Sequence, residues 1–161
     1  MTTTTHPRQI AWILILIVDV GFIGWGAGAT SPDHLLGPGG KAILPAGYEG
    51  FSGGGASWAD LVRTAPKTAA YFVVLYRMYG IFNVAFGIMA TFITLTAFRR
   101  GETWAWWALL VGYTITLVSA ITYDRVVSAI GPFEMTEYVG LALVWGALAV
   151  TAPFRAPQGA S

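Results

Sequence analysis

Four long apolar stretches dominate the sequence and restrict what the chain can fold into. They cover about residues 10–29, 68–98, 104–123 and 133–154. A helix needs roughly 20 mostly apolar residues to cross the hydrocarbon core of a bilayer. Inside a membrane, only helices and closed barrels satisfy all of their own backbone hydrogen bonds. The pattern therefore predicts a single integral membrane domain over residues 1–161, an all-α bundle of four transmembrane helices.

The composition indicates the same class of protein. Of the 161 residues, 55% are hydrophobic and 11% are charged, whereas a soluble domain carries about a quarter charged residues. The expected partner is therefore the lipid bilayer. The net charge of +1 gives no electrostatic basis for binding nucleic acid. The chain has no cysteine, which excludes disulfides, thiolate metal sites, iron–sulfur clusters and cysteine nucleophiles.

The segment between the first two spans, residues 30–67, is rich in glycine and proline and is long for a loop. Ser57 followed by Asp60 predicts a short surface helix over "SWADLVRTA". Apolar residues earlier in the segment are expected to fold over the mouth of the bundle. The second span, 31 residues long, reaches about 46 Å as a helix, against a core of ~30 Å. Its first two turns should therefore project from the bilayer or lie at its interface.

The orientation follows from the arginines. Arg99 and Arg100 lie in the tightest turn, beside a membrane end, where the positive-inside rule is strongest. This favours a multi-pass protein of the plasma membrane with both termini in the cytoplasm, although the cations of the loops and tails, with Arg99 and Arg100 counted, divide equally between the two sides. Alternatively, the first span is a signal peptide cleaved after the small residues 27–29. The length of the apolar run and Asp19 within it argue against cleavage.

Arg77 is a permanent cation near the start of the second span. Counting back from the turn that follows this span, Arg77 lies level with about Val126 and close to Asp124. Counting across the next turn, Glu134 and Glu137 lie near the same depth. One cation and three carboxyl groups are therefore expected at the outer rim. They form either an ion-paired clasp between three helices or the rim of a pocket for a polar head group.

Asp19 lies about 11 residues, or ~16 Å, into the first span. No cation is expected at that depth, so this carboxyl group should take up a proton and bond a hydroxyl such as that of Tyr113. It then serves as a neutral link between helices or, alternatively, in proton relay, ligand contact or pairing with a partner subunit. Asn83 is expected to bond across helices or to contact a ligand. Gly24 and Gly28 form a GxxxG pair for close helix packing.

Other chemistry is sparse. His6 and His34 lie outside the spans. We therefore expect no metal site, no haem and no other cofactor. The sequence lacks a phosphate-binding loop, a nucleophile elbow and a zinc-protease motif. Glu134 and Glu137 are three residues apart and could act as a paired acid and base, although an ion-pair network at a helix end is the simpler use.

The segments "YRMYGIFNVAFGI" and "FRRGETWAWWALL" resemble parts of small, uncharacterised bacterial membrane proteins with four helices, loosely of the DoxX-like type. The resemblance rests on Arg77, Gly80 and Gly87 in the first segment, and on residues 99–101 and 104–107 in the second. It covers about a quarter of the chain. It implies four helices and a bacterial plasma membrane, and it implies no common reaction.

Two classes of function remain open. The first is non-enzymatic: an accessory subunit of a larger membrane complex, or a binder of a small lipophilic or amphiphilic molecule such as a quinone or lipid. The second is a membrane-embedded enzyme acting on a lipid or quinone-like substrate, with Asp19 or the Glu134–Glu137 pair as acid or base. A small proton-coupled carrier is a further alternative, which at four spans would require a dimer.

Overall fold

The computed structural model describes residues 6–32, 34–40, 43–128 and 131–153 of the chain. Within these ranges all regular structure is helical and no strand occurs, which confirms the expected all-α class. The elements in chain order are α1 (His6–Thr30), α2 (Leu44–Phe51), α3 (Trp58–Thr64), α4 (Pro66–Ile93), the π-helical turn η1 (Thr94–Phe98), α5 (Thr103–Val127) and α6 (Met135–Val150).

Three helical stretches are long and apolar enough to cross a membrane: Arg8–Thr30, Pro66–Phe98 and Thr103–Val127. They coincide with the first three predicted spans. α6 is also apolar but has 16 residues, which reach about 24 Å as a helix. To span the hydrocarbon core of a bilayer, which is ~30 Å thick, α6 therefore needs the residues that flank it as well. The last residue of the predicted fourth span, at position 154, lies outside the described residues.

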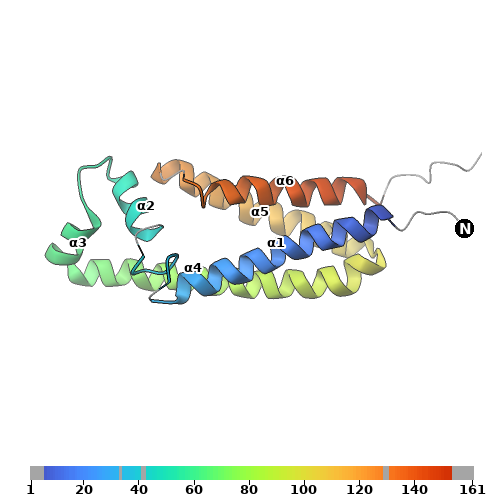
Figure 1. Ribbon diagram of the computed structural model, residues 1–161, viewed down its shortest axis with the longest axis horizontal. Helices are drawn as coiled ribbons and strands as arrows, with labels where there is room; N and C mark the ends of the chain where they lie inside the picture. The colour runs from blue at the N-terminus through green and yellow to red at the C-terminus, as the bar shows by residue number, and fades with distance from the viewer. Residues whose placement is uncertain (1–5, 33, 41–42, 129–130, 154–161) are drawn as a thin grey trace, which may run out of the picture.

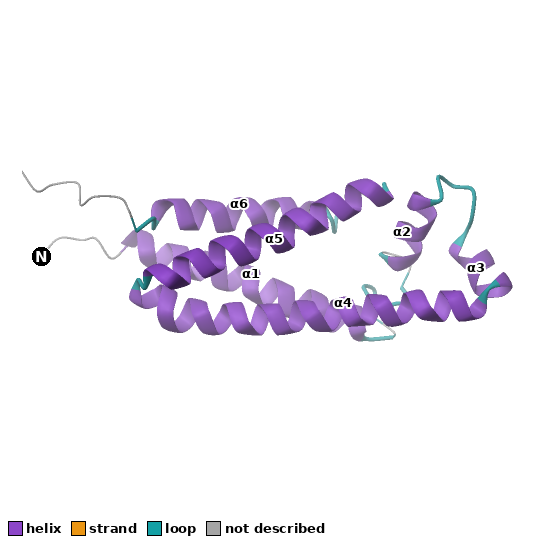
Figure 2. Cartoon of the chain, turned by 180° about the vertical axis from the view of Figure 1, so that it is seen from behind, coloured by secondary structure: helices purple, strands orange, loops and turns teal. Residues whose placement is uncertain are grey.

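The long helices lie side by side in an elongated bundle (Figure 1). α1 packs along α4 for most of its length, and α6 packs against both α1 and α5. α4 and α5 follow each other in the chain but make few contacts with each other. Figure 2 shows them diverging from the turn that joins them. Helices adjacent in sequence are therefore not always the main packing partners.

The two ends of the bundle differ in structure (Figure 1). One end holds the first turn of α1, the turn after η1 and the last turn of α6. At the other end α4 extends beyond its neighbours, and α2 and α3 lie beside its projecting turns. The first turns of the second span thus project beyond the bundle, and their place at or outside the bilayer surface stays a prediction.

The predicted surface helix forms as α3. The Ser57 side chain accepts a hydrogen bond from the backbone N–H of Asp60 at 3.0 Å and donates to the Asp60 carboxylate at 2.9 Å. Arg63, one turn further on, forms an ion pair with Asp60 at 2.8 Å. Capping by Ser57 satisfies a backbone donor that the helix itself leaves unpaired, so α3 begins where the sequence places it.

The close approach of α1 and α4 depends on Gly26 and Gly80. A Cβ atom at Gly80 would lie 2.8 Å from the carbonyl oxygen of Gly26, and one at Gly26 would lie 2.9 Å from the backbone nitrogen of Val84. Gly24 has nothing within 4 Å, so the predicted GxxxG contact through Gly24 is wrong. Residues 24 and 26 lie on nearly opposite sides of a helix with 3.6 residues per turn, and the structure uses Gly26. Gly28 instead packs against His34, whose Nδ1 would lie 2.9 Å from an added Cβ atom.

Candidate functional site

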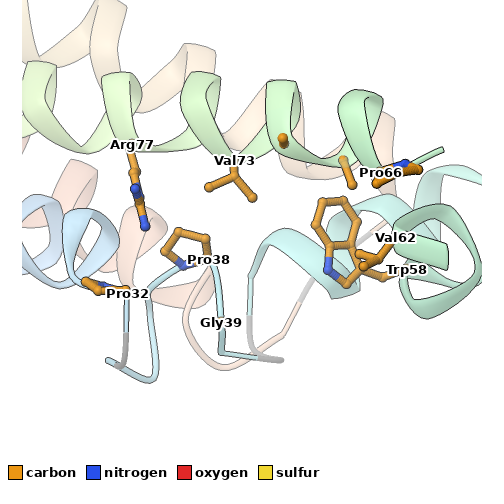
Figure 3. A pocket seen from close by; sticks show the side chains of 10 residues that line it. Pro32, Pro38, Gly39, Trp58, Val62, Pro66, Val73 and Arg77 are labelled. Carbon is orange, nitrogen blue, oxygen red and sulfur yellow. The ribbon is translucent and has the colours of Figure 1, made fainter.

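A pocket of about 420 Å³ lies beside the projecting turns of α4, between this helix, α3 and the segment that follows α1 (Figure 3). Its volume falls in the range of roughly 300–1,000 Å³ typical of small-molecule sites. Most of its lining is apolar, and among the lining residues that the structure describes the charged one is Arg77. The pocket is lined by Pro32, Pro38, Gly39, Trp58, Val62, Pro66, Ala69, Ala70, Val73 and Arg77.

One wall of the pocket is the indole of Trp58, at the first residue of α3. Its ring packs edge to face against Tyr48 of α2, with centroids 5.7 Å apart. Its backbone N–H donates to a carboxylate oxygen of Glu49 at 2.9 Å. The cap at Ser57 fixes the start of the same helix. α2 and α3 therefore hold Trp58 in place against α4.

The opposite wall is a tight turn that contains the buried Pro38. Within it the N–H of Gly37 donates to the carbonyl of His34 at 2.8 Å, and the N–H of Leu36 donates to His34 Nδ1 at 3.1 Å. The hydroxyl of Tyr76 on α4 donates to the carbonyl of Leu36 at 2.6 Å. These bonds attach the turn to α4 and set the width of the pocket.

Arg77 lies at one end of the pocket, and its guanidinium group points from α4 toward Pro32 and Pro38 (Figure 3). The side chain is exposed. The ion pairs found among the described residues lie on α3 and in the turn before α5, and neither includes Arg77. The predicted ion pair between Arg77 and the carboxyl groups of Asp124, Glu134 or Glu137 is therefore not formed.

The prediction for Arg77 failed because counting residues gives depth along a helix and not rotation about it. Tyr76 and Tyr79, on another face of α4, lie within electrostatic range of Glu134 and Glu137, respectively. Arg77 is rotated away from them, toward the turn that follows α1. Since α4 packs mainly on α1 and little on α5, the face that the prediction assigned to Arg77 is occupied by tyrosines.

Asp124, Glu134 and Glu137 do converge at the end of α5 and the start of α6, as predicted. The carboxyl groups of Asp124 and Glu137 interact directly, and Glu134 lies close to both. Asp124 Oδ2 and Glu137 Oε2 are buried without a hydrogen-bond partner among the described residues. The nearby cation Arg125 bonds the hydroxyl of Tyr138 at 3.2 Å instead. Like charges at short range repel, so this cluster requires a shared proton or a cation from outside the described residues.

These acids do not form a recognisable metal site. In the part of the chain that the structure describes, no group of three or more histidine, aspartate or glutamate side chains has an arrangement that could hold a metal ion. Glu134 also contributes to local structure, because its Oε2 accepts a hydrogen bond from the N–H of Gly131 at 2.7 Å. This bond closes the turn before α6.

Asp19 is fully buried and accepts a hydrogen bond from the hydroxyl of Tyr113. The predicted partnership between these two residues is confirmed. Phe22 and Phe86 pack against the Tyr113 ring, with centroids 5.7 Å and 5.2 Å away. Thr94, the first residue of η1, lies beside the carboxyl group and is itself fully buried. Asp19 thus joins α1 to α5 in an enclosed environment.

Asn83 is buried in α4, but its amide nitrogen donates to the backbone carbonyl of Tyr79 in the same helix at 2.8 Å. The side-chain N–H donor of Asn83 therefore does not form the expected hydrogen bond to another helix. Tyr79 in turn packs edge to face against Trp25 of α1, with centroids 5.3 Å apart. Contact between α1 and α4 at this level is therefore aromatic.

Comparison of the chain with family models, with curated proteins and with solved structures finds no match. The resemblance to small bacterial four-helix proteins stays a prediction from the sequence.

The pocket walls formed by Trp58, Pro38 and Val73 were not among the residues expected in a site. A signal was nevertheless present in the sequence. A short helix was predicted to lie directly before a span whose first turns project from the bilayer or lie at its interface. Two such consecutive elements fold back on each other, and the tryptophan at the start of the short helix was the side chain best placed to line the contact.

Proposed function

We propose that this chain is a multi-pass protein of the plasma membrane that binds a small amphiphilic molecule in the pocket at Arg77. The three long helices and the shorter α6 all cross the bilayer, both termini lie in the cytoplasm, and the pocket opens at the outer side. The sequence resemblance to small bacterial four-helix membrane proteins agrees with this proposal.

Support for the orientation comes from the end of the bundle opposite the pocket. Arg99 lies over the ring of Trp12 at 5.2 Å, and Arg100 pairs with Glu102 at 2.7 Å. Trp104 and Trp107 are largely exposed at the same level. Arginines in a short loop beside a membrane end favour the cytoplasmic side, and exposed tryptophans are typical of a membrane interface.

The observation that carries the binding proposal is the pocket of about 420 Å³, with apolar walls and a cation at one end. Apolar walls favour the tail of a ligand through burial from water, and the guanidinium group favours a polar head. An amphiphile meets both requirements at once, whereas a fully polar or a fully apolar ligand meets one of them.

An enzymatic role for Asp19 is less well supported. Its side chain is 0% exposed and is enclosed by α1, η1 and α5, so a substrate has no contact with it. The geometry therefore favours a structural role for Asp19 and leaves ligand binding to the outer pocket.

The proposal is tested with a photoreactive fatty alcohol added to the protein in lipid nanodiscs. We expect crosslinks on pocket residues such as Trp58, Val62 and Val73. The substitution Ala70→Phe places a ring in the pocket lining at an exposed alanine and should remove most of this labelling. The matched control is Ala85→Phe, because Ala85 is also an exposed alanine on α4 but does not line the pocket.

Equal labelling of the wild type and both variants would contradict the proposal. That result would place the probe in the lipid around the bundle and not in the pocket.

A further inference from the structure

Arg77 places a positive charge at one end of the pocket. Among the described residues of the pocket lining, Arg77 is the charged one, and it forms no ion pair within the described part of the chain. The carboxyl groups nearest in depth, those of Asp124 and Glu137, interact with each other and lie on the side of Tyr79. These carboxyl groups therefore do not neutralise the positive charge of Arg77. An anion bound beside Arg77 would neutralise it.

We propose, resting on the proposed function, that the occupant of this pocket is a single-chain fatty acid whose carboxylate binds Arg77. A planar guanidinium group presents two parallel N–H donors that match the two oxygens of a carboxylate. One cation balances the single charge of a carboxylate, whereas a phosphate monoester carries a larger charge near neutral pH.

The shape of the pocket selects a single chain. The lining runs along α4 from Arg77 at one end to Pro66 at the other, with Val73 between them (Figure 3). Trp58 closes the side facing α3. An elongated space of about 420 Å³ suits one acyl chain.

The direction of the pocket indicates the source of the ligand. Pro66 is the first residue of α4, at the end that projects from the bundle (Figure 1), and Arg77 lies further along the helix, at the other end of the pocket (Figure 3). A fatty acid in this pocket therefore has its carboxylate toward the bundle and its tail away from it. A lipid within the outer leaflet has the opposite orientation. The occupant is consequently a free fatty acid that has left the bilayer or arrives from outside, and not a lipid bound in place.

The test compares three ligands with the same alkyl chain: dodecanoate, dodecanol and dodecylamine. Each is titrated into protein in phosphatidylcholine nanodiscs at a pH where the acid is ionised, and adducts are counted by native mass spectrometry against empty nanodiscs. We expect dodecanoate to bind on the order of tenfold more tightly than dodecanol, because a hydrogen bond to a charged group is worth about that factor or more. Dodecylamine should bind most weakly.

Two variants of Arg77 test whether this residue causes the preference for dodecanoate over dodecanol. Arg77→Gln should lower the affinity for dodecanoate on the order of tenfold, to that for dodecanol, and leave dodecanol binding unchanged. Arg77→Lys keeps the charge but not the paired donors, so it should retain part of the preference. The matched control Arg125→Gln removes an exposed arginine at the same end of the bundle, outside the pocket, and should change neither affinity.

The outcomes separate this inference from the proposed function. If dodecanoate and dodecanol bind equally well to the wild type, or if Arg77→Gln binds dodecanoate as the wild type does, the fatty-acid inference is overturned while amphiphile binding stands. If none of the three ligands binds, the proposed function is overturned with it. The ligand comparison on the wild type decides the matter even if the Arg77→Gln variant does not accumulate.

Discussion

Asp19 is a carboxyl group that no cation contacts among the described residues. Tyr113 donates a hydrogen bond to one of its oxygens, and the other oxygen is buried beside Thr94 without reaching hydrogen-bond geometry. A neutral side chain with an acceptor oxygen should therefore be able to take the place of Asp19 and keep the hydrogen bond from Tyr113. We predict that Asp19→Asn changes the free energy of unfolding little. Asp19→Leu, which leaves the Tyr113 hydroxyl unpaired, should cost about 1 kcal/mol, the size of a hydrogen bond between membrane helices.

Both variants are measured by thermal unfolding in the same mild detergent. Tyr113→Phe combined with Asp19→Leu provides the control, because it removes the donor that Asp19→Leu leaves unpaired and should recover part of the loss. If Asp19→Asn destabilises the protein as much as Asp19→Leu does, Asp19 is held as a carboxylate and the neutral link is wrong.

Depth was the part of the candidate site that the sequence determined well. Helix rise and turn position were enough to pair Asp19 with Tyr113 and to bring Asp124 near Glu137. The partner of Arg77 could not be predicted in the same way, because that requires the rotation of α4 about its axis. The rotation is set by the packing of α4 on α1, which depends on glycines whose role the pattern alone does not assign.

At the scale of elements, the contact between α1 and α4 is controlled by Gly26. A Cβ atom added there would lie 2.9 Å from both the backbone nitrogen and a side-chain carbon of Val84. We predict that Gly26→Ala separates the two helices and costs about 1–3 kcal/mol, the usual range for overpacking. Gly24→Ala is the matched control, because nothing lies within 4 Å of that position. It should be neutral or stabilising, since alanine favours a helix over glycine.

Unfolding of these two variants in detergent gives the comparison directly. Equal stability of Gly24→Ala and Gly26→Ala would show that the contact between α1 and α4 tolerates a methyl group. In that event the closeness of these helices would not be determined by Gly26.

The N-terminus of α3 gives a prediction about a single short helix. Ser57→Ala removes the cap and should lower the stability of α3 by about 1 kcal/mol. Hydrogen exchange of the backbone amides of residues 58–64 should then accelerate, while exchange in α4 stays unchanged. Because α3 carries Trp58, ligand binding in the pocket should weaken in the same variant. Unchanged amide protection in α3 would show that packing on α4 and not the cap holds the helix.

The pH dependence of α3 follows from the same contacts. Arg63, and to a lesser degree Ser57, hold the pKa of Asp60 below its ordinary value of 3.8. Since the pKa is lower in the folded state, ionised Asp60 stabilises α3 fully above about pH 4 and loses this effect as the pH falls through the lowered pKa. Amide protection in α3, corrected for intrinsic exchange rates, should drop in that acidic window. The drop should be absent in Asp60→Asn, and its persistence there would assign it to another group.

Not every element could be predicted. α3 has a recognisable cap, whereas α2 contains a proline and two glycines in eight residues, a composition that disfavours a helix in isolation. Tertiary contacts stabilise α2 instead. Tyr48 packs against Trp58 and Phe72, and a Cβ atom at Gly50 would lie 2.5 Å from the carbonyl oxygen of Val127. The π-helical turn η1 likewise has no local signal in the sequence.

At the scale of the whole molecule, the spans were predictable because length and hydropathy decide them, whereas their arrangement was not. Consecutive helices joined by a short turn are expected to pack along their length. α4 and α5 instead diverge, and α1 takes the place beside α4 (Figure 2). The divergence leaves one end of α4 free to contact α3 and the turn that holds Pro38. The pocket therefore results from the arrangement of the bundle and not from any one segment.

The bundle predicts which segments share a side of the membrane. The turn before α5 and the end of α6 lie at one end, and α3 lies at the other (Figure 1). Because the chain has no cysteine, the reaction of a single introduced cysteine shows the side of the membrane on which that position lies. We predict that Ala59→Cys reacts with a membrane-impermeant maleimide on intact cells. Arg100→Cys and Pro153→Cys should react only after permeabilisation, since four spans place both on the cytoplasmic side. Labelling of Pro153→Cys on intact cells, with Arg100→Cys protected, would mean that α6 does not cross the membrane, and a bundle of three spans would replace the one proposed.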